Sequence, residues 1–529
     1  GPASAQIALL LGLLPAAGAG MVWRLARQPG GHPFALTAGS AALLLAVALL
    51  SAMPGWAAPA CLGTVTLIAL ALALRAGNRE LRFAALAFQV AALFALGLTG
   101  HADAEVRRLL ELAPQPDLGQ ALVRWSGALL SAAAMAWGVR RAPAEPGLVG
   151  PGQIVATLVG YGLIAQVVPA DWLGLAVAAS ALLVQLLRER RPQLALLSVG
   201  GTLGGLAALW ALVPVVHWLA GVTDSLGGSP VRVTALPEPV EVLRGLLGPV
   251  LLIGLALHRA AATIPAAPRR LAQASAGIGA LIAAHVLYKQ IFAIASDDRF
   301  VPLGLAERTA WELLLVAGGA VAWHLTRRTR ADTAGPGLAL ALVGAGLGHG
   351  LGYTVLMHNP LWADQAIGGW PLANLLIPAY GTLFAALWLL PRVLLPDGVA
   401  ASPRLAGGLA VARMGLIGLF VLTSLRQLFA GSLPAHVAVG SAEDITWSLA
   451  AVALAVGYLL WGIRSADRTW RLGSLVLMLG AVGKVFLFDA SGLAGLARIA
   501  SFLALGFSLI GIGWLYSRFL KADGHAAEA

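Results

Sequence analysis

Long apolar runs separated by short, arginine-bearing loops constrain this chain more than any other feature. An α-helix needs about 20 apolar residues to cross the hydrocarbon core of a membrane, and by that measure we count about 17 runs. Their approximate centres are Leu13, Leu44, Thr66, Ala91, Ala132, Gly160, Ala179, Leu206, Leu252, Leu281, Ala317, Gly346, Leu383, Ile417, Val456, Leu477 and Leu505. The chain is 59% hydrophobic and 11% charged, whereas soluble domains carry about 25% charged residues. The sequence therefore predicts an all-α polytopic bundle of transmembrane helices, forming a single transmembrane domain over residues 1–529 with no soluble domain.

The charged residues divide unequally between two sets of loops. The basic set holds 23 of the 35 Lys and Arg residues but only 8 of the 24 acids; Arg188, Arg190 and Arg191 form one of its clusters. Cytoplasmic loops carry such an excess of cations, so we place the basic loops and the C-terminus in the cytoplasm. This distribution accounts for the net charge of +11, and we expect no nucleic-acid partner.

Metal and cofactor chemistry finds little support in the residues. The single cysteine, Cys61, excludes an internal disulfide and a cysteine-based metal cluster. The sequence contains no H-E-x-x-H or C-x-x-C-H pattern. His349 and His358 are too far apart to form a ligand pair on one helical turn. We therefore expect no cofactor and no metal site.

Six pairs of apolar runs share one plan, which predicts internal repetition over residues 82–519. Each pair leaves a cytoplasmic arginine, passes through a loop with acids and returns to arginine. Repeats of this kind form stacked supersecondary units, and in membranes they often build a bundle with a site at the repeat interface. Accretion of similar hairpins without duplication is the alternative explanation.

Two local patterns add detail to this plan. Gly344, Gly348 and Gly352 have the small-xxx-small spacing that lets helices approach closely. Residues 101–119 place apolar side chains at helical spacing opposite charged ones, which predicts a short helix lying in the membrane interface.

Ionisable residues collect at the helix ends opposite the basic loops. They form three groups: His285, Lys289, Asp297, Asp298, Glu307, Arg308 and Glu312; Arg426 with Glu443 and Asp444; and Lys484, Asp489 and Arg498. Within the first group, residues four apart share a helix face. A desolvated cleft of Lys and Arg suits an anionic headgroup, a phosphate or an acidic glycan, because the Arg fork matches phosphate. We predict these residues as ligand-binding; the alternative is that each cation pairs with the acids of its own loop.

The C-terminal stretch resembles the DUF2339 family of predicted bacterial membrane proteins. The residues that carry the resemblance are Gly483-Lys484-Val-Phe-Leu-Phe-Asp489, Leu496-Ala-Arg498-Ile-Ala-Ser-Phe502, and Gly506 through Leu515-Tyr516-Ser-Arg518. The resemblance implies a many-helix bundle in a bacterial inner membrane and no assigned activity. The family's long polar or coiled N-terminal region is absent here, and the chain begins Gly1-Pro2, so the resemblance implies a truncated or processed chain.

Three functions fit these residues. The leading one is binding or translocation of an anionic envelope lipid or glycan precursor through an outward-facing basic cleft. Trp362 and Trp370 fit interfacial anchors, and stacking on sugars is their secondary role. The second is a membrane-embedded transferase with an extracytoplasmic active site, for which Asp103, Glu105 and Asp171 are candidate acids. The third is a scaffold subunit that contacts other envelope proteins. The absence of a recognisable catalytic pattern favours binding over catalysis, and membrane lipids are the expected surroundings.

Overall fold

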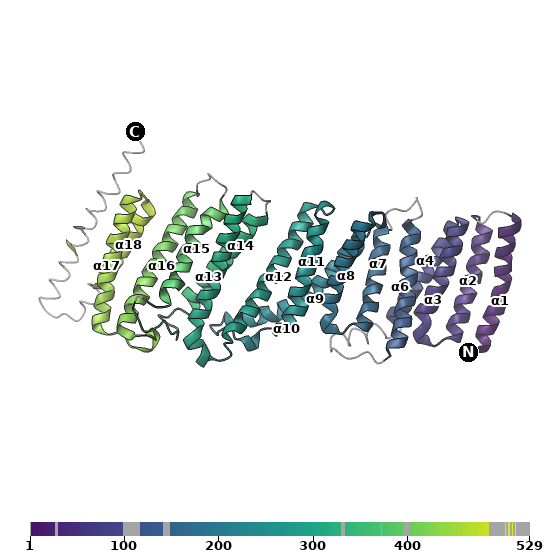
Figure 1. Cartoon of the computed structure of the whole chain (residues 1–529), viewed down its shortest axis with the longest axis horizontal. Helices are drawn as coiled ribbons and strands as arrows, with labels where there is room; N and C mark the ends of the chain where they lie inside the picture. Colours follow the sequence, from purple (N-terminus) through teal and green to yellow (C-terminus); the bar gives the residue numbers. More distant parts are fainter. Residues whose placement is uncertain are drawn as a thin grey trace, which may run out of the picture. The chain divides into compact units, whose positions relative to one another are not determined.

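The structure is a computed structural model, and its described residues form helices and loops without a strand. It describes residues 2–26, 30–98, 117–140, 149–329, 334–371, 373–395 and 401–485, with six positions between 503 and 514. The chain divides into two compact units, the first comprising residues 1–221 and 235–287 and the second residues 222–234 and 288–529. Each unit is an all-α assembly of long helices joined by short connections (Figure 1).

Unit 1 contains the helices up to α12, whose last turns belong to unit 2. Its long helices are α1 (Pro2–Met21), α2 (His32–Ala52), α3 (Ala58–Ala76), α4 (Arg79–Leu98), α6 (Leu118–Arg140), α7 (Val149–Val167), α8 (Ala170–Arg190), α9 (Leu197–Ser225), α11 (Gly248–Arg259) and α12 (Ala266–Phe292). Shorter elements are η1 (Val22–Ala26), η2 (Gly55–Ala57), η4 (Pro192–Leu194), η5 (Val233–Ala235, across the unit boundary), α10 (Pro239–Val242), η6 (Leu243–Leu247) and η7 (Ala260–Ala262).

Unit 2 continues the same pattern of antiparallel helices. It contains α13 (Asp297–Thr329), α14 (Ala334–His349), the π-helix η8 (Gly350–Met357), α15 (Leu376–Leu394), α16 (Pro403–Ala430), η9 (Pro434–His436), α17 (Ser441–Arg464) and α18 (Arg468–Lys484). Neighbouring helices pack against each other in chain order from α13 to α18. The main core of this unit lies between α13, α14, α15 and α16, where Val343, Leu383 and Ala386 are completely buried.

Twelve helices among the described residues are long and apolar enough to span a membrane. The predicted all-α polytopic fold is therefore present, whereas the predicted count of about 17 spans is not confirmed. Each predicted centre from Leu13 to Leu477 lies inside a helix, and Leu505 lies outside the described residues. Four helices with a predicted centre are not among the twelve: α6 and α13, which bury Arg124 and Glu312, α7, and α18, which has 17 residues. Residues 101–116 of the interfacial helix that we predict at 101–119 lie outside the described residues.

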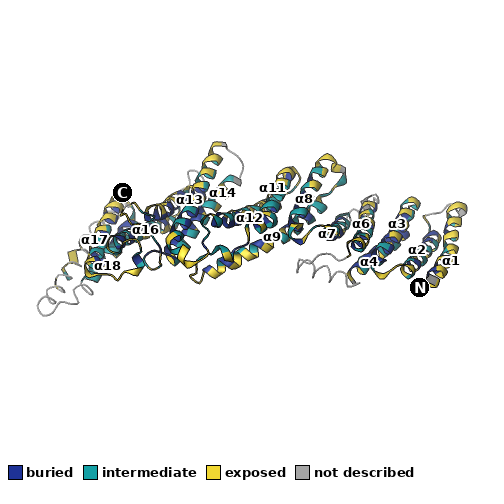
Figure 2. Ribbon diagram, turned by 60° about the horizontal axis from the view of Figure 1, so that its bottom comes forward, coloured by how far each residue is buried: buried dark blue, intermediate teal, exposed yellow. Residues whose placement is uncertain are grey.

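The surface of the helices has the composition expected for contact with lipid. Large apolar side chains such as Leu251, Ile278 and Val476 are more than half exposed, and exposed positions run along the helices in Figure 2. In water such exposed apolar faces would promote aggregation, whereas in a membrane they contact lipid tails that are as apolar as Leu. The buried faces contain small residues instead: Gly63 in α3 lies so close to α6 that an added Cβ would meet the carbonyl oxygen of Gly127 at 2.6 Å.

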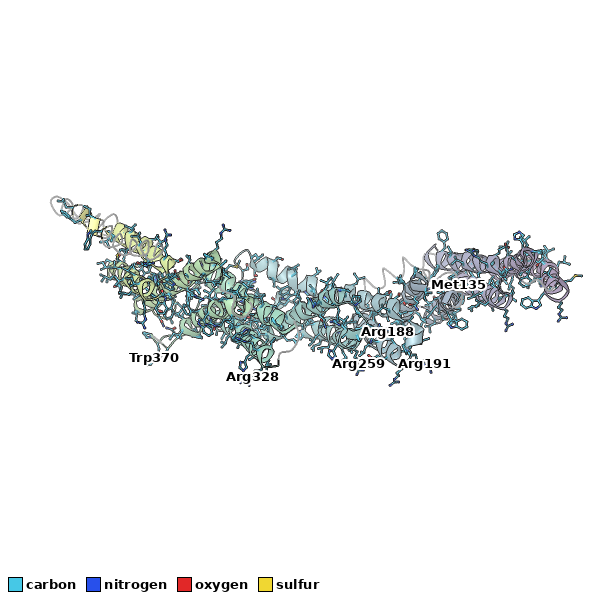
Figure 3. The ribbon with its side chains drawn as sticks, turned by 90° about the horizontal axis from the view of Figure 1, so that it is seen from above. Met135, Arg188, Arg191, Arg259, Arg328 and Trp370 are labelled. Carbon is cyan, nitrogen blue, oxygen red and sulfur yellow. The ribbon has the colours of Figure 1, made fainter. Side chains whose placement is uncertain are left out.

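Helix ends in each unit separate by charge, as the loop pattern predicts. In unit 2 we call the ends with Arg327, Arg328, Arg392, Arg404, Arg464 and Arg468 the basic end, and the ends with Asp297, Asp298, Asp364, Glu443 and Asp444 the acidic end. In unit 1, Arg188, Arg191 and Arg259 lie where α8 and α11 terminate (Figure 3). Arg259 there pairs with Glu189 at 3.1 Å. Helix connections therefore carry most of the cations at one end of each unit.

The glycine-rich stretch of α14 packs through different glycines from those predicted. A Cβ added at Gly344, Gly348 or Gly352 would meet no atom within 4 Å, so these positions are not the close contact. A Cβ added at Gly346 would instead lie 2.9 Å from a side-chain atom of Val316, and a Cβ added at Gly350 would lie 2.2 Å from a side-chain atom of Leu383. The same i,i+4 spacing is used, but the contact face is displaced by two residues. The helix then widens into η8 at Gly350, and π-helical turns of this kind occur frequently at functional sites.

Candidate functional site

The acidic end of unit 2 is closed by three loops that are hydrogen-bonded to one another or to the helix ends. They connect α12 to α13, η8 to α15, and α16 to α17. In the middle loop the amide of Ala366 donates to the carbonyl oxygen of Val301, and the amide of Ile367 donates to that of Ser432. Gln365 and Ile367 in that loop are completely buried. The loops thus form a packed layer, which we call the acidic-end layer, beneath which the ionisable residues lie.

Lys289 and Glu307 form an ion pair within this region. Lys289 is near the end of α12 and Glu307 is in α13, and the distance from Nζ to Oε1 is 2.8 Å. Their side chains are 7% and 4% exposed. The hydroxyl of Tyr288 also donates to the backbone carbonyl of Glu307 at 2.6 Å. The pair and this hydrogen bond fix the end of α12 against the first turns of α13.

Arg308 is buried but has no carboxylate partner among the described residues. Its Nη2 donates to Oε1 of Gln365 at 2.9 Å and to the carbonyl oxygen of His358 at 3.3 Å. Its guanidinium carbon lies 5.3 Å from the ring centroid of Phe300. The Nε and Nη1 atoms are buried without a hydrogen-bond partner. Two nitrogens of this cation are therefore unsatisfied, although the residue is only 4% exposed.

Glu312, one helical turn further along α13, bonds to α14 and η8 rather than to Arg308. Its Oε1 accepts from the hydroxyl of Thr354 at 2.8 Å and lies 3.0 Å from Nδ1 of His349. The carboxylate of Glu312 is completely buried and still attracts Arg308 electrostatically. The shared helix face thus places the two residues together, but each takes its hydrogen bonds from a different element.

Arg426 and Glu443 join α16 to α17 in the most complete contact of the site. The Nη1–Oε2 distance is 2.6 Å, and the two side chains are 5% and 3% exposed. The remaining guanidinium nitrogens donate to backbone carbonyl oxygens, Nε to Pro434 at 3.1 Å and Nη2 to Val437. Because each nitrogen of Arg426 has an acceptor, this arginine serves the connection between the helices.

Lys484, at the end of α18, contacts α17. Its Nζ lies 2.9 Å from Oδ1 of Asp444 and donates to the hydroxyl of Ser448 at 2.8 Å. Adjacent residues Glu443 and Asp444 therefore face different helices, α16 and α18. The other two members of this predicted group, Asp489 and Arg498, lie outside the described residues.

The remaining predicted residues have local partners. His285 accepts through Nδ1 from the indole Nε1 of Trp218 at 3.0 Å, within unit 1. Asp297 pairs with Arg232 at 2.9 Å in an exposed position. Asp171, an acid considered for transferase chemistry, pairs with Arg244 at 2.7 Å. Asp103 and Glu105 lie outside the described residues.

The sequence interpretation missed the neutral residues that complete the site. Gln365, Thr354 and Ser448 provide hydrogen bonds to Arg308, Glu312 and Lys484. Gln365 lies in a loop, where periodicity gives no information about the direction of a side chain. A buried polar residue on an apolar stretch such as Thr354 is a weaker signal, available only once the helix face is known.

His358 follows the end of the span Gly335–Met357 and lies against Arg308 and Phe300. Burial, together with the positive charges of Arg308 and Lys289, lowers its pKa from 6.5 to about 4. The unfolded chain therefore binds this proton more readily than the folded chain between those two values. The contribution of neutral His358 to folding stability is therefore fully present above about pH 6.5, and it decreases as the pH falls toward 4.

We expect this histidine to make unit 2 acid-sensitive. Between about pH 7.5 and about pH 5, the free energy of unfolding should fall by about 2 kcal/mol through His358 alone. Denaturant titration in mixed micelles at the two pH values measures this change, and a His358→Gln variant should lose that part of it. Equal pH dependence of the two proteins would contradict the assignment.

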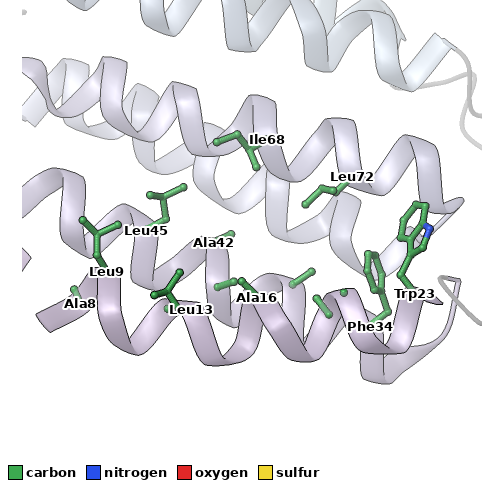
Figure 4. A pocket seen from close by; sticks show the side chains of 15 residues that line it. Ala8, Leu9, Leu13, Ala16, Trp23, Phe34, Ala42, Leu45, Ile68 and Leu72 are labelled. Atoms are coloured by element: carbon green, nitrogen blue, oxygen red, sulfur yellow. The ribbon is translucent and has the colours of Figure 1, made fainter. Parts of the chain in front are cut away.

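Among the described residues, no group of three or more His, Cys, Asp or Glu side chains is placed to hold a metal ion. A cavity of about 480 Å³ in unit 1 lies between α1, α2 and α3 (Figure 4). Leu9, Leu13, Trp23 and Ile68 line it, and its lining contains no charged residue. This cavity has the chemistry of a lipid-tail contact and offers no group that would recognise a headgroup.

A family model described as "Predicted membrane protein (DUF2339)" matches residues 3–519 of this chain, which is nearly its whole length. No curated protein matches the chain. No solved structure matches it either.

Proposed function

We propose that this chain, which belongs to the DUF2339 family of predicted membrane proteins, binds the anionic group of an envelope lipid or glycan precursor beneath the acidic-end layer of unit 2. The binding group is the guanidinium of Arg308. Binding of the anionic group by Arg308 serves either retention or translocation of that precursor. The proposal places the chain in a bacterial inner membrane with its acidic end outside and its C-terminus in the cytoplasm, as the cation excess in the opposite loops favours.

The observation that carries the proposal is the pair of unsatisfied nitrogens on Arg308. A buried charged donor without a partner costs about 1–3 kcal/mol or more, and native structures contain few of them. A buried cation with unsatisfied donors in a multi-span membrane protein is for the same reason a functional-site hypothesis. An anionic oxygen placed beside Nε or Nη1 removes that cost.

The neighbouring atoms narrow the chemistry of the ligand. Oε2 of Glu307 is also buried without a partner, and it requires a donor such as a hydroxyl group. A molecule with both an anionic oxygen and hydroxyl groups satisfies Arg308 and Glu307 together. Phosphorylated polyols and acidic sugars have this combination, whereas fatty acids, sulfate and chloride do not. Trp362 and Trp370, which are exposed in the loop between η8 and α15, offer aromatic faces for a sugar ring.

Three other predicted cations have a lesser part in this proposal. Lys289, Arg426 and Lys484 each form an ion pair with an acid of a neighbouring helix. Their charges are balanced before any ligand arrives. We therefore assign the recognition of the anion to Arg308 and the positioning of the helices to these three.

The proposal is tested on the full chain extracted from native membranes into polymer-bounded discs. Native mass spectrometry of the wild type should reveal a co-purified anionic molecule that carries hydroxyl groups. Arg308→Lys keeps the charge but loses the planar fork, and it should reduce the occupancy at least about tenfold. Arg232→Gln, in an exposed pair at the same end, is the control and should keep the ligand. Wild-type protein without such a molecule, or unchanged occupancy in Arg308→Lys, would overturn the proposal.

A scaffold role is the second candidate, and the three ion pairs favour it. Each pair joins consecutive helices, which is what assembly alone requires. On this reading Arg308 binds ordered water, and the chain co-purifies with other envelope proteins in a defined ratio. Cross-linking in intact membranes, followed by mass spectrometry, would separate a stoichiometric partner from background.

A further inference from the structure

A second candidate site lies at the opposite, basic end of unit 2. It is a groove of about 770 Å³ over α16, between α15 and α17. Its lining includes Trp388, Ile417, Tyr458 and Trp461. Trp388, Tyr458 and Trp461 belong to the halves of their helices that lead to the basic loops, and Ile417 lies at the middle of α16. The groove is therefore aromatic and aliphatic, and it extends from mid-helix toward the basic end.

Arg413 is the charged residue in the lining of this groove. Its Nη2 donates to the carbonyl oxygen of Leu387 at 2.9 Å, and its Nε is buried without a partner. Arg392 lies close enough to repel Arg413 electrostatically. The guanidinium of Arg392 also covers the ring of Trp388, a lining residue, with 3.4 Å between its central carbon and the ring centroid. Two cations thus converge on one end of the groove.

Within the part of the chain that the structure describes, neither arginine has a carboxylate within 4.0 Å. This contrasts with the acidic end, where Lys289, Arg426 and Lys484 are paired. Like charges held near each other repel, and an intervening anion converts that repulsion into two attractions. A phosphate is the anion whose oxygens the arginine fork fits best.

We propose that this groove binds one anionic glycerophospholipid from the membrane leaflet at the basic end. One acyl chain lies along the aromatic lining, and the phosphate lies between Arg413 and Arg392. A volume of several hundred cubic ångströms with mainly apolar walls and one convergent charged group is typical of sites for small amphipathic molecules. A zwitterionic lipid fits less well, because its ammonium group would add a third positive charge beside the two arginines.

The groove can be blocked without touching either arginine. A Cβ added at Gly457, which lines the groove, would meet no atom within 4 Å. Gly457→Leu therefore fills the space without a clash at its point of attachment. Gly480 in α18 is open in the same way but is not in the lining. Gly480→Leu is thus a matched control for the effect of a glycine substitution in a helix.

The test uses the delipidated full chain, to which phosphatidylglycerol or phosphatidylcholine with identical acyl chains is added, and native mass spectrometry measures the bound lipid. Wild-type protein and Gly480→Leu should bind one phosphatidylglycerol at least about tenfold more tightly than phosphatidylcholine. Arg413→Met and Arg392→Met should each remove that preference, and Gly457→Leu should remove binding of both lipids. No preference in the wild type, or a preference that survives in Gly457→Leu, would overturn the proposal. Every protein in this comparison, including the otherwise wild-type one, also carries Arg308→Lys, so that phosphatidylglycerol, which has a phosphate and hydroxyl groups, is not retained at the acidic-end site and the two proposals fail independently.

Discussion

Replacing Glu443 with alanine should lower the free energy of unfolding of unit 2 by about 3–5 kcal/mol, because it leaves a buried arginine without its counter-charge. Arg426 cannot turn toward water, since two of its nitrogens are held by the backbone between α16 and α17. Denaturant titration in mixed micelles, followed by tryptophan fluorescence, measures the change. A second variant with methionine at both Arg426 and Glu443 should recover most of the loss, because it removes both charges together.

The adjacent acid provides the control for this experiment. Asp444 pairs with Lys484, but the two side chains are 42% and 33% exposed. Water and salt screen such a pair, so Asp444→Asn should cost at most about 1 kcal/mol. Comparable losses from Glu443→Ala and Asp444→Asn would contradict the distinction between the buried and the exposed pair.

The second large effect is expected at the connection between α12 and α13. Glu307→Gln should cost about 3–5 kcal/mol, because it leaves Lys289 buried beside Arg308 with no acid at hydrogen-bond distance. Lys289→Met should cost less, since Glu307 still attracts Arg308 electrostatically. The same unfolding titration measures both substitutions. The difference between the two losses of unfolding free energy measures how strongly Glu307 also balances the charge of Arg308.

Asp297→Asn serves as the control for this connection. Asp297 pairs with Arg232 near the same helix ends, but both side chains are well exposed, so the loss should stay below about 1 kcal/mol. If Lys289→Met proved more damaging than Glu307→Gln, the assignment of Arg308 as the neighbour that sets the balance would be wrong.

Several features of the fold could be predicted from the residues because they depend on local chemistry. Apolar length determines where a chain can cross a membrane, and each predicted centre within the described residues lies in a helix. The number of spans was less accessible. Helices α6 and α13 bury the charged residues Arg124 and Glu312, and the cost of such a charge depends on neighbours that hydropathy does not contain.

The candidate site could be predicted only in part, and its partners show why. Helical spacing places Arg308 and Glu312 on one face, and the structure keeps them together. Chain order groups Lys484 with Asp489 and Arg498, which lie outside the described residues, and the structure adds a contact that this order does not predict, with Asp444 on the preceding helix. Gln365 reaches Arg308 from a loop. Spacing along one helix identifies a face, whereas it contains no information about which element covers that face.

By itself, the sequence determined that this is an all-α, multi-span membrane protein of the DUF2339 family, with cations concentrated in one set of loops. Those properties follow from hydrophobicity, period and charge counted along the chain. Only the tertiary structure decided that Arg426 and Lys289 are balanced by acids, that Arg308 keeps unsatisfied nitrogens, and that Arg413 and Arg392 converge on a groove. The energy of a buried charge depends on atoms within a few ångströms of it, and those atoms come from helices that only packing brings together.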